Sequence, residues 1–371
     1  MGIRMRKWND VLTIISGKNQ KAVANPDGDY PIYGSGGIMG YADDYLCEAG
    51  TTIVGRKGTI NNPIYVNEKF WNVDTAFGIT PGESLSEKYL YYFCRSYNFK
   101  ALDKSTTIPS LAKRDLLTIE MPVPPLPEQK RIVAQIEELF SQLDSGVETL
   151  KKTKKQLAVY RQAVLKEAFG EIEESTTMDS IAKMIDPQPS HRTPPEVING
   201  IPYVGIGDID YLNKKIMFSS ARKVSPALLK EHKERYVLRV GDFVMGKIGT
   251  IGKPYRVELP QNYTWSANVI LIQPNNEKIY PEFLFWQFSS PLVTQQLSVG
   301  ATATSQPAFG IKKARLINIK ICDLQSQQKI VSELEGKMSV CDSIERTVDA
   351  ALQQAEAMRQ SILKQAFEGK L

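Results

Sequence analysis

Two short patterns in the sequence contain residue types that could do chemistry on nucleic acids. Asn62-Pro63-Ile64-Tyr65 is close to the Asn-Pro-Pro-Tyr/Phe catalytic motif of amino-methyltransferases, but it lacks the second proline and no glycine-rich cofactor motif precedes it. Asp210 and Glu231-x-Lys233 have the residue types of a metal-dependent nuclease, although such a site needs several converging carboxylates. No Walker A motif is present. Both patterns are therefore weak candidates for catalysis.

Composition excludes several other classes of protein. The four cysteines are widely separated and only two histidines are present, which predicts no zinc site, no disulfide framework and a cytoplasmic location. Hydrophobic residues make up 42% and charged residues 23% of the chain, so disorder cannot dominate. We expect no signal peptide and no membrane span. The net charge of +5 is compatible with a nucleic-acid partner.

Glycine-containing and polar loops are better candidates for binding than for catalysis. The segments 50–63 and 241–254 share a pattern of glycines with basic residues between them, and both 105–109 and 302–307 are Ser/Thr-containing loops that end in proline. Glycine lets a backbone approach a duplex closely, basic side chains contact phosphates, and glutamine can pair with adenine. Tight turns with solvated charges are the alternative interpretation. The predicted DNA-contacting residues are Ser35, Arg56, Lys57, Thr59, Thr106, Thr107, Lys247, Thr250, Lys253, Thr304, Ser305 and Gln306.

A duplicated segment organises the chain and must position these loops. Residues 126–169 align with residues 324–367 without a gap, at a constant offset of 198 positions. The identical pairs include Gln129 and Gln327, Glu137 and Glu335, Asp144 and Asp342, and Arg161 and Arg359.

Each copy is predicted to form one long helix with a coiled-coil seam. Prolines at 122–127 mark the start of the first helix and Gly170 marks its end. A 44-residue helix would span roughly 65 Å and needs a partner in water, and the other copy is the nearest one. Lys337 interrupts the stripe of the second helix. The predicted seam residues are Ile132, Ile136, Leu139, Leu143, Leu150, Leu157, Val164, Ile330, Leu334, Ile344, Val348, Met358 and Ile362.

The segments that precede the helices are related more weakly and alternate with them. Short runs rich in β-branched and aromatic residues between Gly, Asn and Pro predict domains with many strands. We therefore predict an α+β protein in which two mixed α/β domains are joined by an antiparallel helix pair with an internal pseudo-two-fold repeat. The expected order is a domain at 1–125, a helix at 126–170, a domain at 171–323 and a helix at 324–371.

These features together resemble the specificity (S) subunits of type I restriction–modification systems. The resemblance is carried by Pro125-Leu-Pro-Glu-Gln-Lys-Arg-Ile-Val133, by Ile362-Leu-Lys-Gln-Ala-Phe-Glu-Gly-Lys-Leu371, and more weakly by the glycine segments 33–41 and 55–60. It covers essentially the full length of the chain. The second helix departs from the pattern, because it opens with Asp323-Leu-Gln-Ser rather than with prolines, so its first turn is expected to be less sharply fixed.

The resemblance implies a reader of duplex DNA that has no catalytic activity of its own and binds no cofactor. In this family two target recognition domains each read one half of a bipartite site, and the helix pair holds them apart and inverted. Two methyltransferase (M) subunits dock on the chain, and restriction (R) subunits can join them; no membrane is involved. Two alternatives stay open at this point: a stand-alone restriction endonuclease with a metal site at Asp210 and Glu231, and a coiled-coil adaptor that binds only proteins.

Overall fold

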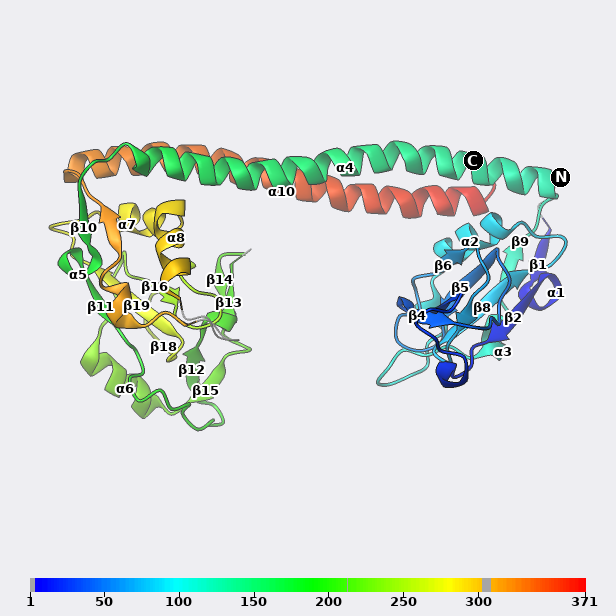
Figure 1. Ribbon diagram of the computed structural model, residues 1–371, viewed down its shortest axis with the longest axis horizontal. Coiled ribbons are helices and arrows are strands. Elements are labelled where there is room, and N and C mark those ends of the chain that lie inside the picture. Colours follow the sequence, from blue (N-terminus) through cyan, green and yellow to red (C-terminus); the bar gives the residue numbers. More distant parts are fainter. Residues whose placement is uncertain (1–3, 212, 302–307) are drawn as a thin grey trace. The chain divides into compact units, whose positions relative to one another are not determined.

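Two long helices lie where the duplicated segment predicts them (Figure 1). Helix α4 is Leu126–Gly170 and helix α10 is Leu324–Phe367. The computed structural model describes residues 4–211, 213–301 and 308–371. The chain divides into unit 1, residues 1–152 and 348–371, and unit 2, residues 153–347. Each unit therefore combines one sheet-containing domain with part of each long helix.

The domain of unit 1 is built on short strands in three sheets. Its main sheet is antiparallel with the strand order β2-β8-β5-β6, a second sheet has the order β4-β3-β7, and β1 pairs with β9. In the second sheet, β3 and β7 run parallel. The strands are β1 Met5–Lys7, β2 Leu12–Ser16, β3 Tyr30–Gly34, β4 Gly37–Ala42, β5 Thr51–Gly55, β6 Ile64–Val66, β7 Trp71–Asn72, β8 Ala76–Pro81 and β9 Glu120–Pro122. The short helices are α1 Trp8–Val11, η1 Gln20–Ala22, α2 Glu87–Ser96, η2 Phe99–Leu102 and α3 Lys113–Leu116.

The domain of unit 2 repeats this topology. Its sheets have the orders β11-β19-β16-β17 and β15-β12-β18, with β10 paired to β20 and an added hairpin of β13 and β14. The strands are β10 Ser175–Thr177, β11 Ala182–Ile185, β12 Ile201–Val204, β13 Ile209–Asp210, β14 Lys215–Ile216, β15 Arg222–Val224, β16 Phe243–Gly246, β17 Pro254–Arg256, β18 Thr264–Trp265, β19 Val269–Pro274 and β20 Asn318–Lys320. The helices are α5 Met178–Ile181, η3 Ile206–Asp208, α6 Pro226–Arg235, α7 Pro281–Phe288, α8 Pro291–Gly300 and α9 Ile311–Ala314.

Equivalent glycines show that the two domains share a local design as well as a topology. Gly55 ends β5 and Gly246 ends β16, and a methyl group on either glycine would overlap a backbone oxygen four residues further along the chain. Gly58 and Gly249 both have positive φ, 81° and 75°, which favours glycine at this point of each loop. The domains differ at one connection. In unit 1 a two-residue turn joins β3 to β4, whereas in unit 2 residues 205–221 connect the corresponding strands β12 and β15.

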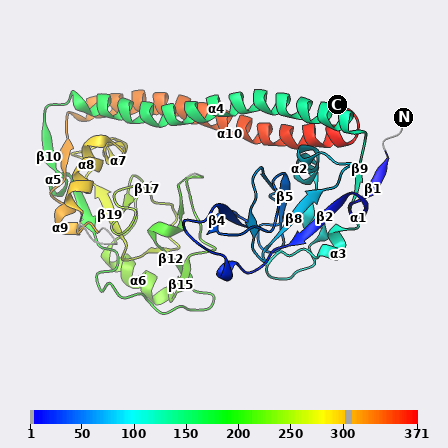
Figure 2. The same cartoon turned by 45° about the vertical axis from the view of Figure 1, so that its right-hand side comes forward.

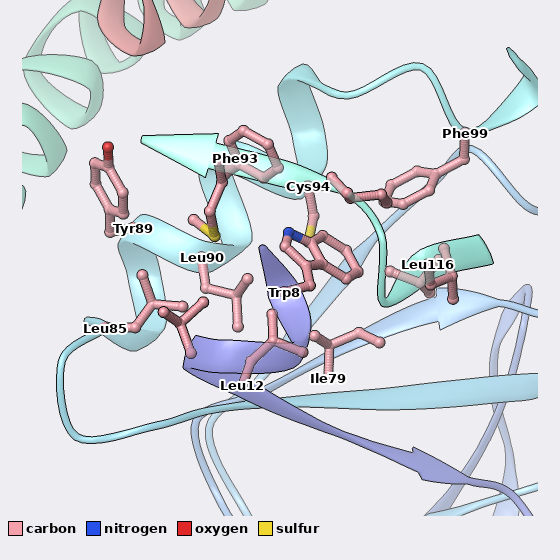
Figure 3. Close-up of a cluster of buried hydrophobic side chains, with 14 of the residues drawn as sticks. Trp8, Leu12, Ile79, Leu85, Tyr89, Leu90, Phe93, Cys94, Phe99 and Leu116 are labelled. Carbon is pink, nitrogen blue, oxygen red and sulfur yellow. The ribbon is translucent and has the colours of Figure 1, made fainter. Parts of the chain in front are cut away.

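The core of unit 1 joins the domain to both long helices. Trp8 is fully buried, and its ring centroid lies 6.3 Å from that of Phe93 and 6.1 Å from that of Phe99 (Figure 3). The same cluster includes Ile136 of α4 and Leu363 of α10. Because these side chains share one core, the fold of the first domain and the pairing of the helices stabilise each other within this unit.

The two helices run antiparallel in each unit, as predicted, and lie side by side in both views (Figures 1 and 2). In unit 1, Arg131 donates to the Leu371 carbonyl at 3.1 Å, while Asp144, further along α4, pairs with the earlier residue Arg359 of α10. In unit 2, Val164, Leu165 and Phe169 share a core with Val331, Leu334 and Met338.

Reciprocal ion pairs follow from this duplication. In unit 2, the Arg161 guanidinium lies 2.8 Å from Asp342 and 3.0 Å from Glu345. Arg359 and Asp144 of unit 1 are the residues that correspond to Arg161 and Asp342 at the offset of 198, and they also form a pair. One identical Arg–Asp pair therefore stabilises the antiparallel arrangement in each unit.

The predicted seam is wrong at alternate positions. Ile344 and Met358 are 40% and 46% exposed, while the Arg359 side chain next to Met358 is only 16% exposed. Lys337 is exposed and does not interrupt the seam, because Met338 is buried in its place. The sequence has apolar residues at consecutive positions such as 330 and 331, so the 3.5-residue repeat could start from either one. In the structure the second residue of this pair faces the partner helix more fully. The other predicted seam residues are buried or half-buried, namely Ile132, Ile136, Leu139, Leu143, Leu150, Leu157, Val164, Ile330, Leu334, Val348 and Ile362.

The start of α10 is fixed by a side-chain cap, contrary to the expectation from its sequence. Asp323 accepts a hydrogen bond from the Ser326 backbone N–H at 3.0 Å, and the hydrogen bonds from Ser326 hold the pKa of Asp323 below its ordinary value. The Asp323 cap therefore fixes the start of α10, as the prolines fix the start of α4.

Candidate nucleic-acid interface

Three loops of unit 1 lie against one another. They are the β3–β4 turn, the β5–β6 loop and the segment 103–110. The Gly58 N–H donates to the Pro109 carbonyl at 2.9 Å, and Lys57 and Ser110 form a β-bridge. A methyl group placed on Gly58 would lie 3.7 Å from the Ser35 hydroxyl oxygen. The tertiary structure thus brings together segments that are more than 70 residues apart in the sequence.

All six predicted DNA-contacting residues of unit 1 lie on these three loops. Lys57 and Thr59 are exposed, as are Thr106 and Thr107, and Ser35 is half-buried. The Arg56 guanidinium donates to the Asp74 carbonyl at 3.1 Å and lies 6.0 Å from the centroid of the Phe77 ring, so its orientation is set by the domain. We call this set of loops the unit 1 loop cluster.

The segment that carries Thr106 and Thr107 is closed at its base by Asp103. This carboxylate accepts hydrogen bonds from the Ser105 hydroxyl at 2.7 Å, from the Ser105 N–H at 3.0 Å and from the Ser110 N–H at 3.0 Å. These hydrogen bonds, led by the one from the Ser105 hydroxyl, lower the pKa of Asp103. Because the folded-state pKa is depressed, this closure is present at neutral pH and is lost as the pH falls through the lowered pKa.

Unit 2 has an equivalent arrangement of loops. The Phe309 N–H donates to the Lys247 carbonyl at 2.8 Å, and Ile248 forms a β-bridge with Ala308, matching the bridge between Lys57 and Ser110. Thr250 is exposed on the β16–β17 loop. The Lys253 ammonium lies 3.9 Å from the centroid of the Tyr211 ring. We call this the unit 2 loop cluster; three predicted contacts, Thr304, Ser305 and Gln306, lie outside the described residues.

Lys247 is the predicted contact whose position does not fit phosphate binding. Its side chain is 11% exposed, and its ammonium lies 2.8 Å from the Asp186 carboxylate, which is 16% exposed. The sequence showed a cation between glycines but not its acidic partner 61 residues earlier. Because the pair is largely shielded from solvent, Lys247 stabilises the domain internally, and we leave it out of the proposed interface.

Replacing Lys247 with alanine is expected to lower the free energy of unfolding of unit 2 by about 2 kcal/mol, because the Asp186 carboxylate would be left poorly solvated without its nearest cation. Urea denaturation followed by circular dichroism measures the change. The exposed Lys57→Ala variant is the matched control and should have wild-type stability. Wild-type stability of Lys247→Ala combined with weaker DNA binding would instead make Lys247 a phosphate contact.

Sequence reasoning missed exposed apolar side chains near the unit 1 loop cluster. Ile38 and Met39 of β4 are 56% and 64% exposed, and Ile108 is 63% exposed on the segment 103–110. Such side chains can contact thymine methyl groups in the major groove. In the segment 33–41 the apolar pair Ile38 and Met39 stands between glycines, which is compatible with an exposed hairpin. The order of apolar and polar residues does not distinguish such a hairpin from a buried strand.

The patterns considered for catalysis do not converge into a site. Asp210 accepts hydrogen bonds from the Asn213 N–H at 3.0 Å and from the Asn213 side-chain amide at 2.7 Å. Glu231 and Lys233 lie on α6, whose His232 is buried. Within residues 4–211, 213–301 and 308–371, no group of three or more His, Cys, Asp or Glu could hold a metal ion. In the same described residues, no helix has the length and apolar content needed to span a membrane.

Comparison with known proteins matches these observations. The family model described as the type I restriction modification DNA specificity domain matches residues 2–158 and 195–354. The EcoBI specificity subunit of Escherichia coli is 26% identical over 86% of this chain and 73% of its own length. A putative type I specificity subunit of Haemophilus influenzae, S.HindORF215P, is 24% identical over 95% of this chain and 92% of its own length.

Solved structures share the fold. A chain from a structure described as the basis of complex assembly and conformational transition of the type I R–M system has a TM-score of 0.74 at 16% identity, covering 99% of this chain and 98% of that one. The HsdS subunit of Thermoanaerobacter tengcongensis has a TM-score of 0.52 at 16% identity, covering 99% and 97%. The chain therefore belongs to the family of type I restriction–modification specificity subunits, the non-catalytic subunits that determine which DNA sequence is recognised.

Proposed function

We propose that this chain reads a bipartite duplex DNA site, one half through the unit 1 loop cluster and the other through the unit 2 loop cluster. The observation that carries the proposal is that equivalent loops, with equivalent glycines and equivalent β-bridges, are built twice on the same sheet topology. A duplicated reader fits a DNA site with two halves. In this proposal two methyltransferase subunits assemble with the chain, and restriction subunits can join them.

Loops on a sheet scaffold are suited to this role because their side chains can change without loss of the core. Lys57, Thr59, Thr106 and Thr107 project from loops that backbone hydrogen bonds hold together. In this proposal Arg56 and Lys57 contact phosphates, and the threonines contact base edges. Sequence-dependent DNA shape adds to these contacts, so the loop residues do not form a simple code for bases.

Lys57→Ala is expected to weaken DNA binding about 3- to 10-fold and to reduce the slope of log affinity against log salt by about 0.9, because one phosphate contact is lost. Fluorescence anisotropy at several salt concentrations, with the chain in complex with its methyltransferase subunit, measures both quantities. Lys151→Ala removes an exposed lysine from α4 and is the control. An unchanged salt slope for Lys57→Ala would mean that Lys57 does not contact a phosphate.

The proposed function is tested directly by mapping modified adenines in the host genome with this chain present and deleted. We expect one bipartite sequence to be modified in the presence of the chain and unmodified in its absence. The purified complex should also prefer that duplex over a scrambled one of equal length. Equal binding to both duplexes, together with an unchanged methylation map, would contradict the proposal.

A further inference from the structure

The hairpin of β3 and β4 in unit 1 is exposed and carries no charge. Strand β4 is an edge strand of the sheet β4-β3-β7, and its residues Ile38, Met39 and Tyr41 are 56%, 64% and 46% exposed. Residues 30–42 contain no charged side chain. Soluble proteins usually protect an exposed edge strand with charges or with proline, and β4 has neither. We therefore expect this edge to be covered when the protein works.

The turn end of this hairpin has open space around it. A methyl group placed on Gly36, Gly37 or Gly40 would meet no atom within 4 Å apart from those of the neighbouring residues. The other end of β4 is covered, because Ala24 forms a β-bridge with Ala42. The hairpin is therefore anchored at its base, and a ligand can approach its turn end without displacing any other part of the domain.

A β-bulge in the hairpin lies at its exposed apolar residues. In the register of β3 and β4, Ile38 pairs with Tyr33 and Gly40 pairs with Ile32, so Met39 is an extra residue between the two pairs. A bulge bends its strand and changes the direction of a side chain, and bulges are common next to binding and active sites. We call Ile38 and Met39 the apolar tip.

The Met39 side chain lies across a glycine of the neighbouring strand. A methyl group on Gly34 would be 2.6 Å from the Met39 sulfur and 3.6 Å from a methyl carbon of Val73. Gly34 is buried, so the lack of a side chain there provides the space that the thioether occupies. Methionine is flexible and polarisable, which suits it to contacts with apolar groups of a ligand.

The apolar tip is continuous with the unit 1 loop cluster. The turn between β3 and β4 carries Ser35, whose hydroxyl oxygen would lie 3.7 Å from a methyl group on Gly58. Ile108 is 63% exposed and precedes Pro109, whose carbonyl accepts from the Gly58 N–H at 2.9 Å. Lys57 supplies a cation directly before Gly58. Uncharged apolar side chains and a cation suited to a phosphate therefore occur in one set of loops.

A two-stranded hairpin of this kind fits the major groove of duplex DNA. The groove is about 12 Å wide and admits a β-ribbon, and the apolar group that it presents is the C5-methyl of thymine. Contacts to phosphates use cations and polar groups, so an uncharged apolar tip is suited to base edges and not to the DNA backbone. Two side chains are also a small surface for a protein partner, because a stable protein interface buries about 800 Å² on each side.

The corresponding part of unit 2 has a different character. Strands β12 and β15 correspond to β3 and β4, and the connection between them, residues 205–221, includes Asp208, Asp210, Lys214 and Lys215. A charged connection therefore takes the place of the uncharged hairpin turn of unit 1. The two units are thus expected to use different chemistry at this point of their half-sites.

We propose that the apolar tip, Ile38 and Met39, enters the major groove of the half-site that unit 1 reads and contacts the C5-methyl group of thymine. The inference rests on the proposed function and adds the chemical group that is recognised. It assigns this methyl contact to the half-site of unit 1, because only the hairpin of unit 1 presents an uncharged apolar pair at this place. The cations and threonines of the unit 1 loop cluster keep their proposed contacts with phosphates and other base edges.

The test measures the affinity of the chain, in complex with its methyltransferase subunit, for duplexes in which each thymine in turn is replaced by deoxyuridine. Deoxyuridine differs from thymidine only by the missing C5-methyl group. The half-site of unit 1 is the half whose sequence changes when residues 1–125 are exchanged. Deoxyuridine at the contacted position of that half-site should weaken binding about 4-fold, the effect expected for one buried methyl group.

Alanine variants of the apolar tip should remove this discrimination. Ile38→Ala and Met39→Ala should each lower the ratio of affinities for the thymine and deoxyuridine duplexes from about 4 towards 1, because the contact with the methyl group is lost. Gly34→Ala retains both side chains but displaces the Met39 sulfur, and it should lower the same ratio. Ile198→Ala and Met5→Ala are the matched controls, because these side chains are 92% and 54% exposed and lie outside the hairpin, and both should leave the ratio unchanged.

Three results would overturn the inference. Deoxyuridine could have no effect at any thymine of the unit 1 half-site, the tip variants could weaken binding to both kinds of duplex equally, or they could release the methyltransferase subunit, which would make the tip a protein contact. Each of these results leaves the proposed function standing as long as the wild-type complex prefers its bipartite duplex over a scrambled one. Equal binding of the wild-type complex to those two duplexes would instead contradict the proposed function itself, so the two failures are distinguishable.

Discussion

A chimaera in which residues 1–125 are replaced by the first recognition domain of a relative with a known target is expected to change one half of the recognised sequence and to leave the other half unaltered. The loss of affinity for the original site should be about 10³-fold or more, because specific and non-specific binding differ by at least that factor. Affinity should return on a hybrid duplex that combines the two half-sites.

The physical reason is that each unit carries its own reader. The clusters that form the core of unit 2 contain no residue of 1–125, and the unit 2 loop cluster is held by contacts within residues 186–309. The junction should follow residue 125, and the incoming domain must keep its contacts with Ile136 and Leu363. The reciprocal chimaera at 171–323 is the control and should change only the other half. A change in both halves would contradict independent readers.

Replacing the buried Gln129 with leucine is expected to lower the free energy of unfolding of unit 1 by about 3 kcal/mol. Gln129 accepts from the Ser86 N–H at 2.8 Å and donates to the carbonyls of Ser84 at 2.9 Å and Pro124 at 2.8 Å. Leucine keeps much of the volume but leaves these backbone groups unsatisfied, which costs about 1–3 kcal/mol for each group that water cannot reach. Amide hydrogen exchange should show the loss of protection at the start of α2.

The equivalent variant Gln327→Leu should have a similar effect in unit 2, confined there to α7 and the start of α10. Gln327 accepts from the Tyr280 N–H at 2.7 Å and donates to the Cys322 carbonyl at 2.7 Å, one bond fewer than Gln129. Its cost should therefore be slightly smaller. Gln142→Leu, at an exposed position of α4, is the matched control. Destabilisation of the control by the same amount would mean that the buried hydrogen bonds are not the cause.

The order of domains and helices, and the pairing of the two long helices, could be predicted because both follow from the apolar periodicity and the duplicated segment. The alignment of 126–169 with 324–367 predicted both helices and their antiparallel pairing, since a 44-residue apolar stripe has few other ways to be buried. The reciprocal Arg161–Asp342 and Arg359–Asp144 pairs confirm that pairing. The pattern of glycines and basic residues also indicated the loops that later proved to lie together in unit 1.

What only the tertiary structure decided depends on neighbours that are distant in the sequence. The phase of the helix seam was set by packing, because consecutive apolar residues such as Ile132 and Val133 permitted two registers. The burial of Lys247 was set by Asp186, a partner that no local pattern reveals. The same is true of α2 and α7, because the residue that precedes each of these short helices donates to a buried glutamine of a long helix, Gln129 or Gln327. The local sequence determines which apolar residues recur on one face of a helix and are buried. Which polar groups pair with each other depends on residues that only the folded chain brings together.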